Sequence, residues 1–320
     1  MTRSGVPESG VDLPAVDPAP WWVSPASWIA RRLPAGRYPF IHHVCPRPNR
    51  RFWASLPAAL GGSMFLCDLR DSISREACLT GQYEPQETTL LRALLKPGMT
   101  VVDVGANWGY HTLLAAHLVG RGGRVISVEP DPRLFGTLSL NIARNGLGHV
   151  SARQIAAADA PGRLRLLGYD PSDGNYGVSQ LAVDDGGGDD AFLVEARDLD
   201  GLLADMDVPH VDVMKMDVEG AEALALPGLE RMLKTGGIRR LLLELHPAAL
   251  AARGTRPETV LAGLTAHRYR VWSLDHSREM SRRVAYGRVA TLDELLKPAD
   301  ADAINGSWPH LLLTAPGVAF

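Results

Sequence analysis

The alternation of strand-like and helix-like segments from Thr100 to the C-terminus constrains the fold more than any other feature of this sequence. The strand-like segments are nearly continuous apolar runs, which are typical of strands covered by helices on both faces of a parallel sheet. We expect strands at 100–105, 124–130, 150–159, 163–170, 210–218, 238–247, 269–275 and 310–316, and helices at 109–120, 133–146, 220–237 and 256–268. This alternation predicts an α/β, Rossmann-like fold with a mostly parallel sheet and right-handed crossovers.

Charge and composition exclude several classes of protein. The 33 Lys and Arg residues are balanced by 36 Asp and Glu residues, so the formal net charge is -3 and no overall basic field exists for nucleic acid or an anionic membrane. No apolar run reaches the ~20 residues that span a bilayer, and the N-terminus lacks the apolar segment of a secretion signal. The cysteines Cys45, Cys67 and Cys78 lack CxxC spacing, so we expect packing roles in a reducing compartment. These observations predict a cytoplasmic protein without nucleic-acid or membrane partners.

The region before residue 61 differs in amino-acid composition from the rest of the chain. Residues 1–20 are rich in Pro, Gly and small polar residues, and we expect them to be disordered. Residues 21–60 contain several prolines and form an expected irregular Trp/Pro-rich appendage with a short helix from Pro25. The main α/β domain is expected over 61–320, beginning with a strand near 63–68 and helices near 71–80 and 85–95. Exposed tryptophans Trp21, Trp22 and Trp28 favour a homodimer formed through the appendage.

The glycine loop after the first expected strand, VVDVGANWGYHT at 101–112, does not match two common phosphate-binding motifs. A dinucleotide fingerprint needs glycines at 105, 107 and 110, but the sequence has Gly105, Asn107 and Tyr110. No lysine follows the loop, so a P-loop is excluded as well. The loop therefore favours a ligand other than a pyrophosphate or a mononucleotide phosphate.

Two acids at strand ends favour a cationic ligand that carries a ribose. Asp103 precedes the loop and would supply negative charge for an ammonium or sulfonium group, while Gly105 and Gly109 let the backbone approach a ligand closely. Glu129 ends the second strand, where a carboxylate can accept both ribose hydroxyls. This spacing predicts a site for S-adenosyl-L-methionine (SAM).

Four segments resemble the FkbM-type SAM-dependent methyltransferases. They are GQYEPQETTLLRALLKPGMTVVDVGANWGYHTLLAA, RVISVEPDPRLFGTLSLNIARNG, VDVMKMDVEGAE and LLLELHP, and the resemblance covers about residues 62 to 275. It implies a class I methyltransferase fold with a seven-stranded sheet, and O-methylation of a hydroxyl on a sugar, polysaccharide or natural product. The resemblance also places Glu84 near the cofactor. The expected cofactor-binding residues are Glu84, Asp103, Gly105, Asn107, Gly109, Tyr110, His111, Thr112, Glu129, Asp159 and Asp217.

Titratable groups near the ends of two later strands are the candidates for catalysis. Lys215, Asp217 and Glu219 alternate along the fourth strand and so share one side if the strand stays extended. Glu244 and His246 share one side of the next strand. Lys215 is expected to neutralise Asp217 or Glu244, and the resemblance places Asp217 at the methionyl end of SAM or at the acceptor. His246, Glu244 and Glu219 are alternative general bases, with Asp217 in the same catalytic set.

Several other readings stay open. Asp217, Glu219 and His246 also resemble a hard-metal set that would orient a diol with Mg²⁺, although no metal site is predicted, and a metal at His42, His43 and Cys45 is disfavoured. The loop at 170–180 is a candidate wall of the acceptor pocket, and the arginines between the last two strands would suit a phosphorylated or carboxylated acceptor; these are Arg278, Arg282, Arg283 and Arg288. Alternatives to a small-molecule or glycan methyltransferase are a catalytically silent adenosyl-binding module and a nucleic-acid methyltransferase.

Overall fold

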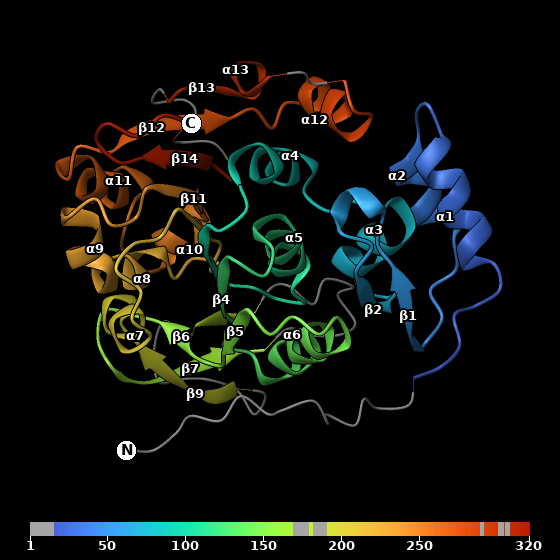
Figure 1. The fold of residues 1–320 in the computed structure, drawn as a ribbon, viewed down its shortest axis with the longest axis horizontal. Helices are drawn as coiled ribbons and strands as arrows, with labels where there is room; N and C mark the ends of the chain where they lie inside the picture. The colour runs from blue at the N-terminus through green and yellow to red at the C-terminus, as the bar shows by residue number, and fades with distance from the viewer. Residues whose placement is uncertain (1–15, 169–178, 182–190, 289–290, 300–303, 305–307) are drawn as a thin grey trace.

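The computed structural model describes residues 16–168, 179–181, 191–288, 291–299, 304 and 308–320 (Figure 1). The order of the large sheet, from edge to edge, is β13-β12-β14-β11-β10-β3-β4-β5. Its strands are β3 (Thr100–Val104), β4 (Arg124–Val128), β5 (Val150–Arg153), β10 (Val213–Met216), β11 (Arg240–Glu244), β12 (Arg270–Leu274), β13 (Leu296–Pro298) and β14 (His310–Thr314). The five strands from β5 to β11 are parallel, and β14 runs antiparallel to both of its neighbours, β11 and β12.

The order of the strands places a switch point between β3 and β10. The chain builds outward from β3 through β4 to β5, then returns to β10 on the other side of β3. Ligands in open α/β sheets bind beyond the carboxyl ends of the strands at such a point. The register puts Lys215 of β10 opposite Asp103 of β3, and Glu244 of β11 opposite His310 of β14. Four titratable residues from different parts of the chain therefore meet at this edge.

Helices cover both faces of the sheet, and each face has its own buried core. The helices are α1 (Val23–Arg32), α2 (Arg37–Pro39), α3 (Ser72–Thr80), α4 (Pro85–Leu94), α5 (Tyr110–Val119), α6 (Pro132–Arg144), α7 (Leu199–Asp205), α8 (Glu222–Ala225), α9 (Glu230–Lys234), α10 (Pro247–Ala252), α11 (Pro257–Ala266), α12 (Arg278–Ala285) and α13 (Leu292–Leu295). Residues of α4 and α5 pack on one face, while residues of α7, α9 and α11 pack on the other. Among the described residues, no helix combines the length and apolarity that crossing a bilayer requires.

The sheet differs from the expected seven strands in one respect. The short strand β13 adds an eighth strand at the edge, paired with β12.

The expected helix at 220–237 is divided into α8, a 3-10 turn and α9, because Pro227 has no N–H to continue the helical hydrogen bonds. The expected strand at 150–159 is likewise two strands, since β6 (Ala156–Ala157) belongs to a second sheet in the order β6-β9-β7-β8. Its other members are β7 (Gly162–Leu167), β8 (Gln180–Leu181) and β9 (Ala191–Arg197), of which β8 and β9 were not expected.

The segment at 21–60 was expected to be irregular, but it contains regular secondary structure. It contains α1 and the strand β1 (Arg51–Ser55), which pairs antiparallel with β2 (Met64–Asp68). Its residues Ala30, Ile41 and Phe52 are fully buried in the same core as α5, because α1 places its small and apolar residues on the face that meets α3. Most of the expected disordered segment, residues 1–15, lies outside the described residues, while the Asp17 N–H donates to the Arg51 carbonyl at 3.1 Å. The three cysteines are free and buried.

Candidate functional site

The loop after β3 forms one wall of a cavity over the carboxyl ends of β3, β4 and β10, here called the first cavity. Gly105 has a φ of 81°, and a Cβ there would lie 1.7 Å from the Asp217 carbonyl oxygen, so only glycine permits this approach of the two loops. The N–H groups of Gly105 and Ala106 both donate to the Val128 carbonyl at 2.9 Å. Asn107 also has a left-handed backbone (φ 52°), and its Oδ1 accepts the Trp108 N–H at 2.7 Å. The loop is therefore held rigidly with its backbone facing the cavity.

Glu129 lies where the sequence predicted an acid beside this loop. Its side chain lines the first cavity, and the residue is only 4% exposed. Each carboxylate oxygen accepts one backbone N–H: Oε2 from Asn107 at 2.8 Å and Oε1 from Asp131 at 2.9 Å. Burial raises the pKa of Glu129 to about 8, although these hydrogen bonds oppose the shift.

Three other expected cofactor-binding residues lie away from the first cavity. Asp103 is buried beneath the loop, where Thr112 Oγ1 donates to its Oδ2 at 2.6 Å, and neither residue lines the cavity. Burial raises the pKa of Asp103. Gly109 begins α5, and a Cβ there would lie 2.6 Å from Leu138 Cδ1, so its role is to let α6 pack closely. Asp103 therefore does not line the first cavity, and its contact with a ligand stays a prediction.

Asp159 is exposed and does not line the first cavity, in contrast to its assignment from the sequence. The neighbouring Ala156 and Ala157 line it instead, because β6 ends before the acid. Tyr110 and His111 do lie at the cavity wall. Burial lowers the pKa of His111 to about 3, so its imidazole is neutral near pH 7.

Lys215 is the charged centre of the site. Its Nζ lies 3.0 Å from Asp217 Oδ2 and 3.8 Å from Glu84 Oε2, with Asp103 on the adjacent strand. Burial alone would lower the pKa of Lys215, but these carboxylates outweigh it and raise that pKa well above its ordinary value. Asp217 lines the first cavity, and burial of its carboxylate is outweighed by Lys215, so its pKa is lowered. The cavity wall therefore carries a fixed carboxylate whose charge is partly balanced by a buried ammonium.

The strand β10 ends at Met216, so Asp217 and Glu219 lie in the following turn rather than on the strand. Glu219 has a φ of 50° and Gly220 a φ of 92°, and a Cβ on Gly220 would lie 2.2 Å from Ala249 Cβ. This turn still brings Asp217 and Glu219 to one side, as expected from the sequence. Burial raises the pKa of Glu219 to about 7.

His246 is held by a buried acid that the sequence analysis did not select. Its Nδ1 lies 2.8 Å from Glu222 Oε1, and the Glu222 side chain is fully buried. The other ring nitrogen, Nε2, faces three carboxylates: Glu219 at 3.4 Å, Glu244 at 3.6 Å and Asp217 at 3.9 Å. Burial would lower the pKa of His246, but the hydrogen bond to Glu222 and the nearby carboxylates outweigh it, so that pKa is raised.

A second cavity adjoins this cluster and shares Tyr83 with the first. Its lining includes Glu84, Glu244, His276 and His310. Burial raises the pKa of Glu84 to about 7, and burial together with Asp217 and Glu84 raises the pKa of Glu244 to about 11, so Glu244 is protonated near pH 7. The second cavity is therefore lined by carboxyl groups of which one is neutral.

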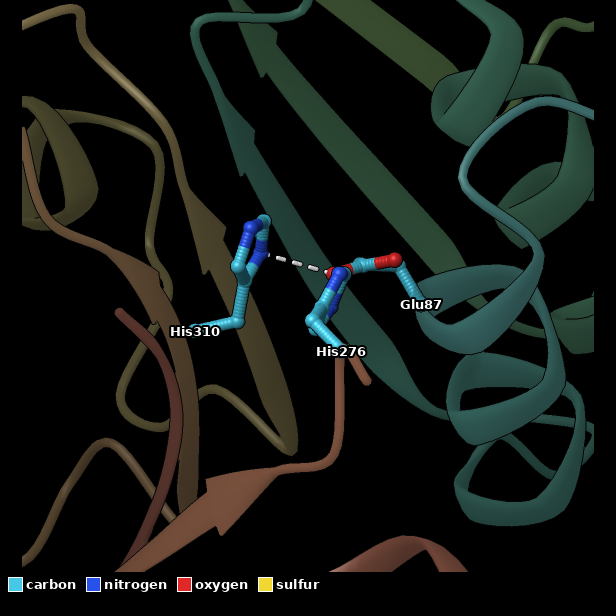
Figure 2. Close-up of side chains that lie close together, drawn as sticks. All are labelled: Glu87, His276 and His310. Atoms are coloured by element: carbon cyan, nitrogen blue, oxygen red, sulfur yellow. Dashed lines mark hydrogen bonds and ion pairs between the residues drawn. The ribbon is translucent and has the colours of Figure 1, made fainter. Parts of the chain in front are cut away.

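Two histidines at the rim of the second cavity converge on one buried carboxylate (Figure 2). His276 Nε2 and His310 Nδ1 each lie 2.7 Å from Glu87 Oε1, and the two imidazole rings stack at 3.7 Å. Burial would raise the pKa of Glu87, but the two histidines outweigh it and lower that pKa well below its ordinary value. His310 Nδ1 also lies 3.6 Å from Glu244 Oε2, so this group positions one side of the acidic cluster.

Four residues of the site were not expected from the sequence: Glu222, Glu87, His276 and His310. Glu222 is part of the segment VDVMKMDVEGAE that carries the family resemblance, so its position was visible without its role. The other three lie on α4, after β12 and on β14, and only the tertiary fold brings them together. The donor atoms of Asp217, Glu219 and His246 lie within 4.8 Å of one another, so these residues remain a candidate metal set, as do Glu87, His276 and His310.

The candidate residues for binding the acceptor are dispersed. Most of the loop at 170–180 lies outside the described residues, but Ser179 lines the first cavity. The arginines expected to form one cluster are divided: Arg283 pairs with Glu294, Arg278 and Arg282 are exposed, and Arg288 lines a separate groove. His42, which was disfavoured as a metal ligand, lies 3.1 Å from Glu76.

The sheet order with an antiparallel β14, the glycine loop and the acid after β4 define a class I methyltransferase fold. A model of the FkbM methyltransferase domain matches residues 103–271, more than half of the chain. The chain belongs to the FkbM methyltransferase family.

Individual relatives match shorter stretches. The chain is 28% identical over 209 residues to the AMB antimetabolite synthetase AmbE of Pseudomonas aeruginosa, covering 56% of this chain and 10% of AmbE. It is 27% identical over 156 residues to the methyltransferase sdnD of Sordaria araneosa, covering 41% of this chain and 60% of sdnD. The chain thus spans less than two thirds of either relative. A solved structure of Aeropyrum pernix fibrillarin with bound SAM is 12% identical to this chain, with a TM-score of 0.39, over 80% of this chain and 90% of that chain.

Proposed function

We propose that this protein transfers the methyl group of SAM to a hydroxyl oxygen of a sugar, polysaccharide or other natural product. The observation that carries the proposal is the His246 imidazole, which Glu222 holds through Nδ1 while Nε2 faces the acids beside the first cavity. A hydroxyl group must lose its proton as it is methylated, and an oriented histidine with a raised pKa suits that task near neutral pH. The name of one relative, an antimetabolite synthetase, supports a small-molecule acceptor.

The residues of the first cavity fit SAM. The Glu129 oxygens each accept one backbone N–H and retain a further acceptor position for a ribose hydroxyl. His111 lines the first cavity, and its Nε2 is buried without a hydrogen-bond partner among the described residues, 3.7 Å from Glu84 Oε2, so we propose that His111 contacts a polar group of the ligand. Asp217 would supply negative charge near the sulfonium or the methionyl ammonium. We propose Glu129, His111 and Asp217 as the principal cofactor contacts, with the Gly105 to Tyr110 loop providing the backbone surface.

In the proposed reaction, SAM supplies an activated methyl group, so the protein has to align the acceptor and remove one proton. The Nδ1–H of His246 would donate a hydrogen bond to Glu222 Oε1, which leaves the lone pair of Nε2 free to take the hydroxyl proton. Glu244 is protonated near pH 7 and would donate a hydrogen bond to the acceptor rather than act as the base. Glu219, with a pKa of about 7, is the alternative base.

The acceptor is proposed to enter through the second cavity. This cavity reaches Glu244 and shares Tyr83 with the first, so an acceptor hydroxyl there would face the end of the cofactor cavity. The lining is rich in carboxyl and imidazole groups, which match a hydroxylated molecule. A homodimer through the appendage remains part of the proposal, because Trp21 and Trp28 are 86% and 59% exposed, whereas Trp22 packs partly against the core.

Transfer of the label from methyl-labelled SAM to a panel of hydroxylated sugars and natural products tests the reaction type. We expect a labelled methyl ether that resists mild base, and no labelled product with matched deoxy acceptors. Label in an amine or in RNA would contradict O-methylation. Binding of S-adenosylhomocysteine (SAH) without transfer to any acceptor would instead support a silent adenosyl-binding module.

The raised pKa of Glu129 predicts how cofactor affinity depends on pH. Ribose hydroxyls donate to the ionised carboxylate, so binding favours loss of the proton that Glu129 holds below about pH 8 in the free protein. As pH rises from 6 towards 8, we expect the Kd for SAH to fall by about tenfold per pH unit, and calorimetry should show proton release. Glu129→Gln should bind SAH more weakly and lose this slope. An unchanged slope in the variant would assign the proton to another group, such as Asp103, whose pKa burial also raises.

A further inference from the structure

A groove is lined, among the residues that the structure describes, by five arginines and by no acid. The arginines are Arg31 and Arg32 of α1, Arg37 of α2, Arg92 of α4 and Arg288 after α12. They come from four separate elements, so the concentration of positive charge results from the fold rather than from one basic stretch of sequence. In a chain with a net charge of -3, this groove is a local exception.

None of these five guanidinium groups forms an ion pair within 4 Å with a carboxylate in the described part of the chain, although other arginines do. Their contacts are neutral: Arg31 donates to the Cys78 carbonyl at 3.3 Å, and Arg37 donates to Gln82 Oε1 at 3.5 Å. Arg37 also lies over the Tyr286 ring at 4.2 Å. Converging like charges repel each other, and a bound anion would reduce this repulsion.

Arg37 indicates where in the groove an anion would bind. The residue is only 6% exposed, and its Nε is buried without a hydrogen-bond partner among the described residues. The Nε of Arg31 is buried and unpartnered as well. A buried guanidinium N–H without an acceptor costs free energy, and an oxyanion that accepts several N–H groups at once would remove that cost. Phosphate matches the forked donors of arginine in this way.

The groove is continuous in the chain with the proposed acceptor cavity. Arg37 and Gln82 line the groove, while the next residues, Tyr38 and Tyr83, line the second cavity. An acceptor that occupies both would extend from the groove, which would hold its anionic group, to the second cavity, which would hold its hydroxyl group. The acids Glu76, Glu84 and Glu244 of that cavity would repel a long polyanion, so a compact anion fits better than a nucleic acid.

We propose that this arginine groove binds the phosphate or diphosphate group of the methyl acceptor, so that the acceptor is a phosphorylated small molecule. This inference rests on the proposed function for the position of the reacting hydroxyl, but the anion site itself does not depend on it. Arg37 and Arg31 would form the inner part of the site, and the exposed Arg32, Arg92 and Arg288 its outer part.

Calorimetry of the full chain with inorganic pyrophosphate tests the site without requiring turnover. We expect saturable 1:1 binding, and the double variant Arg92→Gln/Arg288→Gln should raise the Kd at least about tenfold. Both residues are exposed, so the variant should keep its fold. The matched control is Arg278→Gln/Arg282→Gln, which removes two exposed arginines that do not line the groove and should leave the Kd within twofold.

The outcomes separate this inference from the proposed function. Absence of pyrophosphate binding, or equal weakening by both double variants, would overturn the groove as a specific site. Binding of a single-stranded oligonucleotide more tightly than pyrophosphate would overturn the choice of a small acceptor. SAH affinity should be the same in all variants. If a neutral hydroxylated acceptor is methylated while pyrophosphate does not bind, only the groove fails; if pyrophosphate binds but no hydroxyl is ever methylated, the proposed function fails.

Discussion

Replacing Lys215 with methionine is expected to destabilise the protein by about 3–5 kcal/mol, because it removes one partner of a buried ion pair and leaves its carboxylates uncompensated. Lys215 is 5% exposed, and its ammonium lies 3.0 Å from Asp217 and 3.8 Å from Glu84. Asp103 lies opposite it in the sheet register. Chemical denaturation followed by circular dichroism would measure the loss of unfolding free energy.

Two comparisons separate charge from packing at Lys215. Lys234→Met removes an exposed lysine of α9 and should change the unfolding free energy by no more than about 0.5 kcal/mol. The double variant Lys215→Met/Asp217→Asn removes both members of the closest pair, so it should be more stable than Lys215→Met alone. A double variant that is less stable by the sum of the two single effects would show that the pair contributes no coupling, and would contradict the charged-centre interpretation.

The central fold followed from the sequence because local patterns and the global fold agree there. The apolar runs of β3, β4, β10 and β11 are buried on both faces, and only a parallel sheet with helices on both sides buries such strands. The glycine loop and Glu129 were correctly placed beside one cavity, since strand ends of a parallel sheet meet at one edge. The strand β13 was not expected, because its sequence LKP contains a proline and carries no strand pattern.

The differences between the expected and the observed structure have a common physical origin. From sequence alone, a polar residue at a strand end can point into a cavity or under the loop that follows, and Asp103 and Thr112 bond each other beneath the loop. The appendage was expected to be irregular because its prolines break periodicity, yet Phe52 and Ile41 pack in the core of the domain. Partners such as Glu87 and His310 are 223 positions apart, so no local pattern joins them.

The charge states also depended on burial that no sequence pattern shows. Glu244 was a candidate base by its position, but the structure surrounds it with Asp217 and Glu84, and burial raises its pKa to about 11. Glu222 was hidden inside a helix-like segment, and only the fold shows that its side chain is fully buried against His246. Burial therefore distinguishes two neighbouring candidate bases that the sequence left as alternatives, Glu244 on β11 and His246 in the turn after it.

The different protonation states of His246 and Glu244 predict different effects on kcat when each residue is replaced by glutamine. We expect His246→Gln to lower kcat by about 10²- to 10⁴-fold, the range typical for loss of a general base. Glu244→Gln should keep most of the wild-type kcat, because the carboxyl group is already protonated near pH 7 and the amide retains its shape and its ability to donate a hydrogen bond. Both variants should bind SAH with a Kd within about threefold of the wild type, since neither residue lines the first cavity. Initial rates with the acceptor found in the labelling assay, together with SAH calorimetry, would measure both quantities.

The pH profile distinguishes a base from a residue that only supports the structure. A base must be deprotonated, so wild-type kcat should rise with pH and level off above the pKa of His246, which its carboxylate neighbours raise above the ordinary 6.5. His246→Gln should lose this rising limb, and Glu219→Gln should retain it. If Glu219→Gln loses the limb while His246→Gln keeps it, the base is Glu219, whose own pKa of about 7 would place the limb in a similar range. The two variants therefore assign the proton to one of two groups whose charged atoms lie 3.4 Å apart.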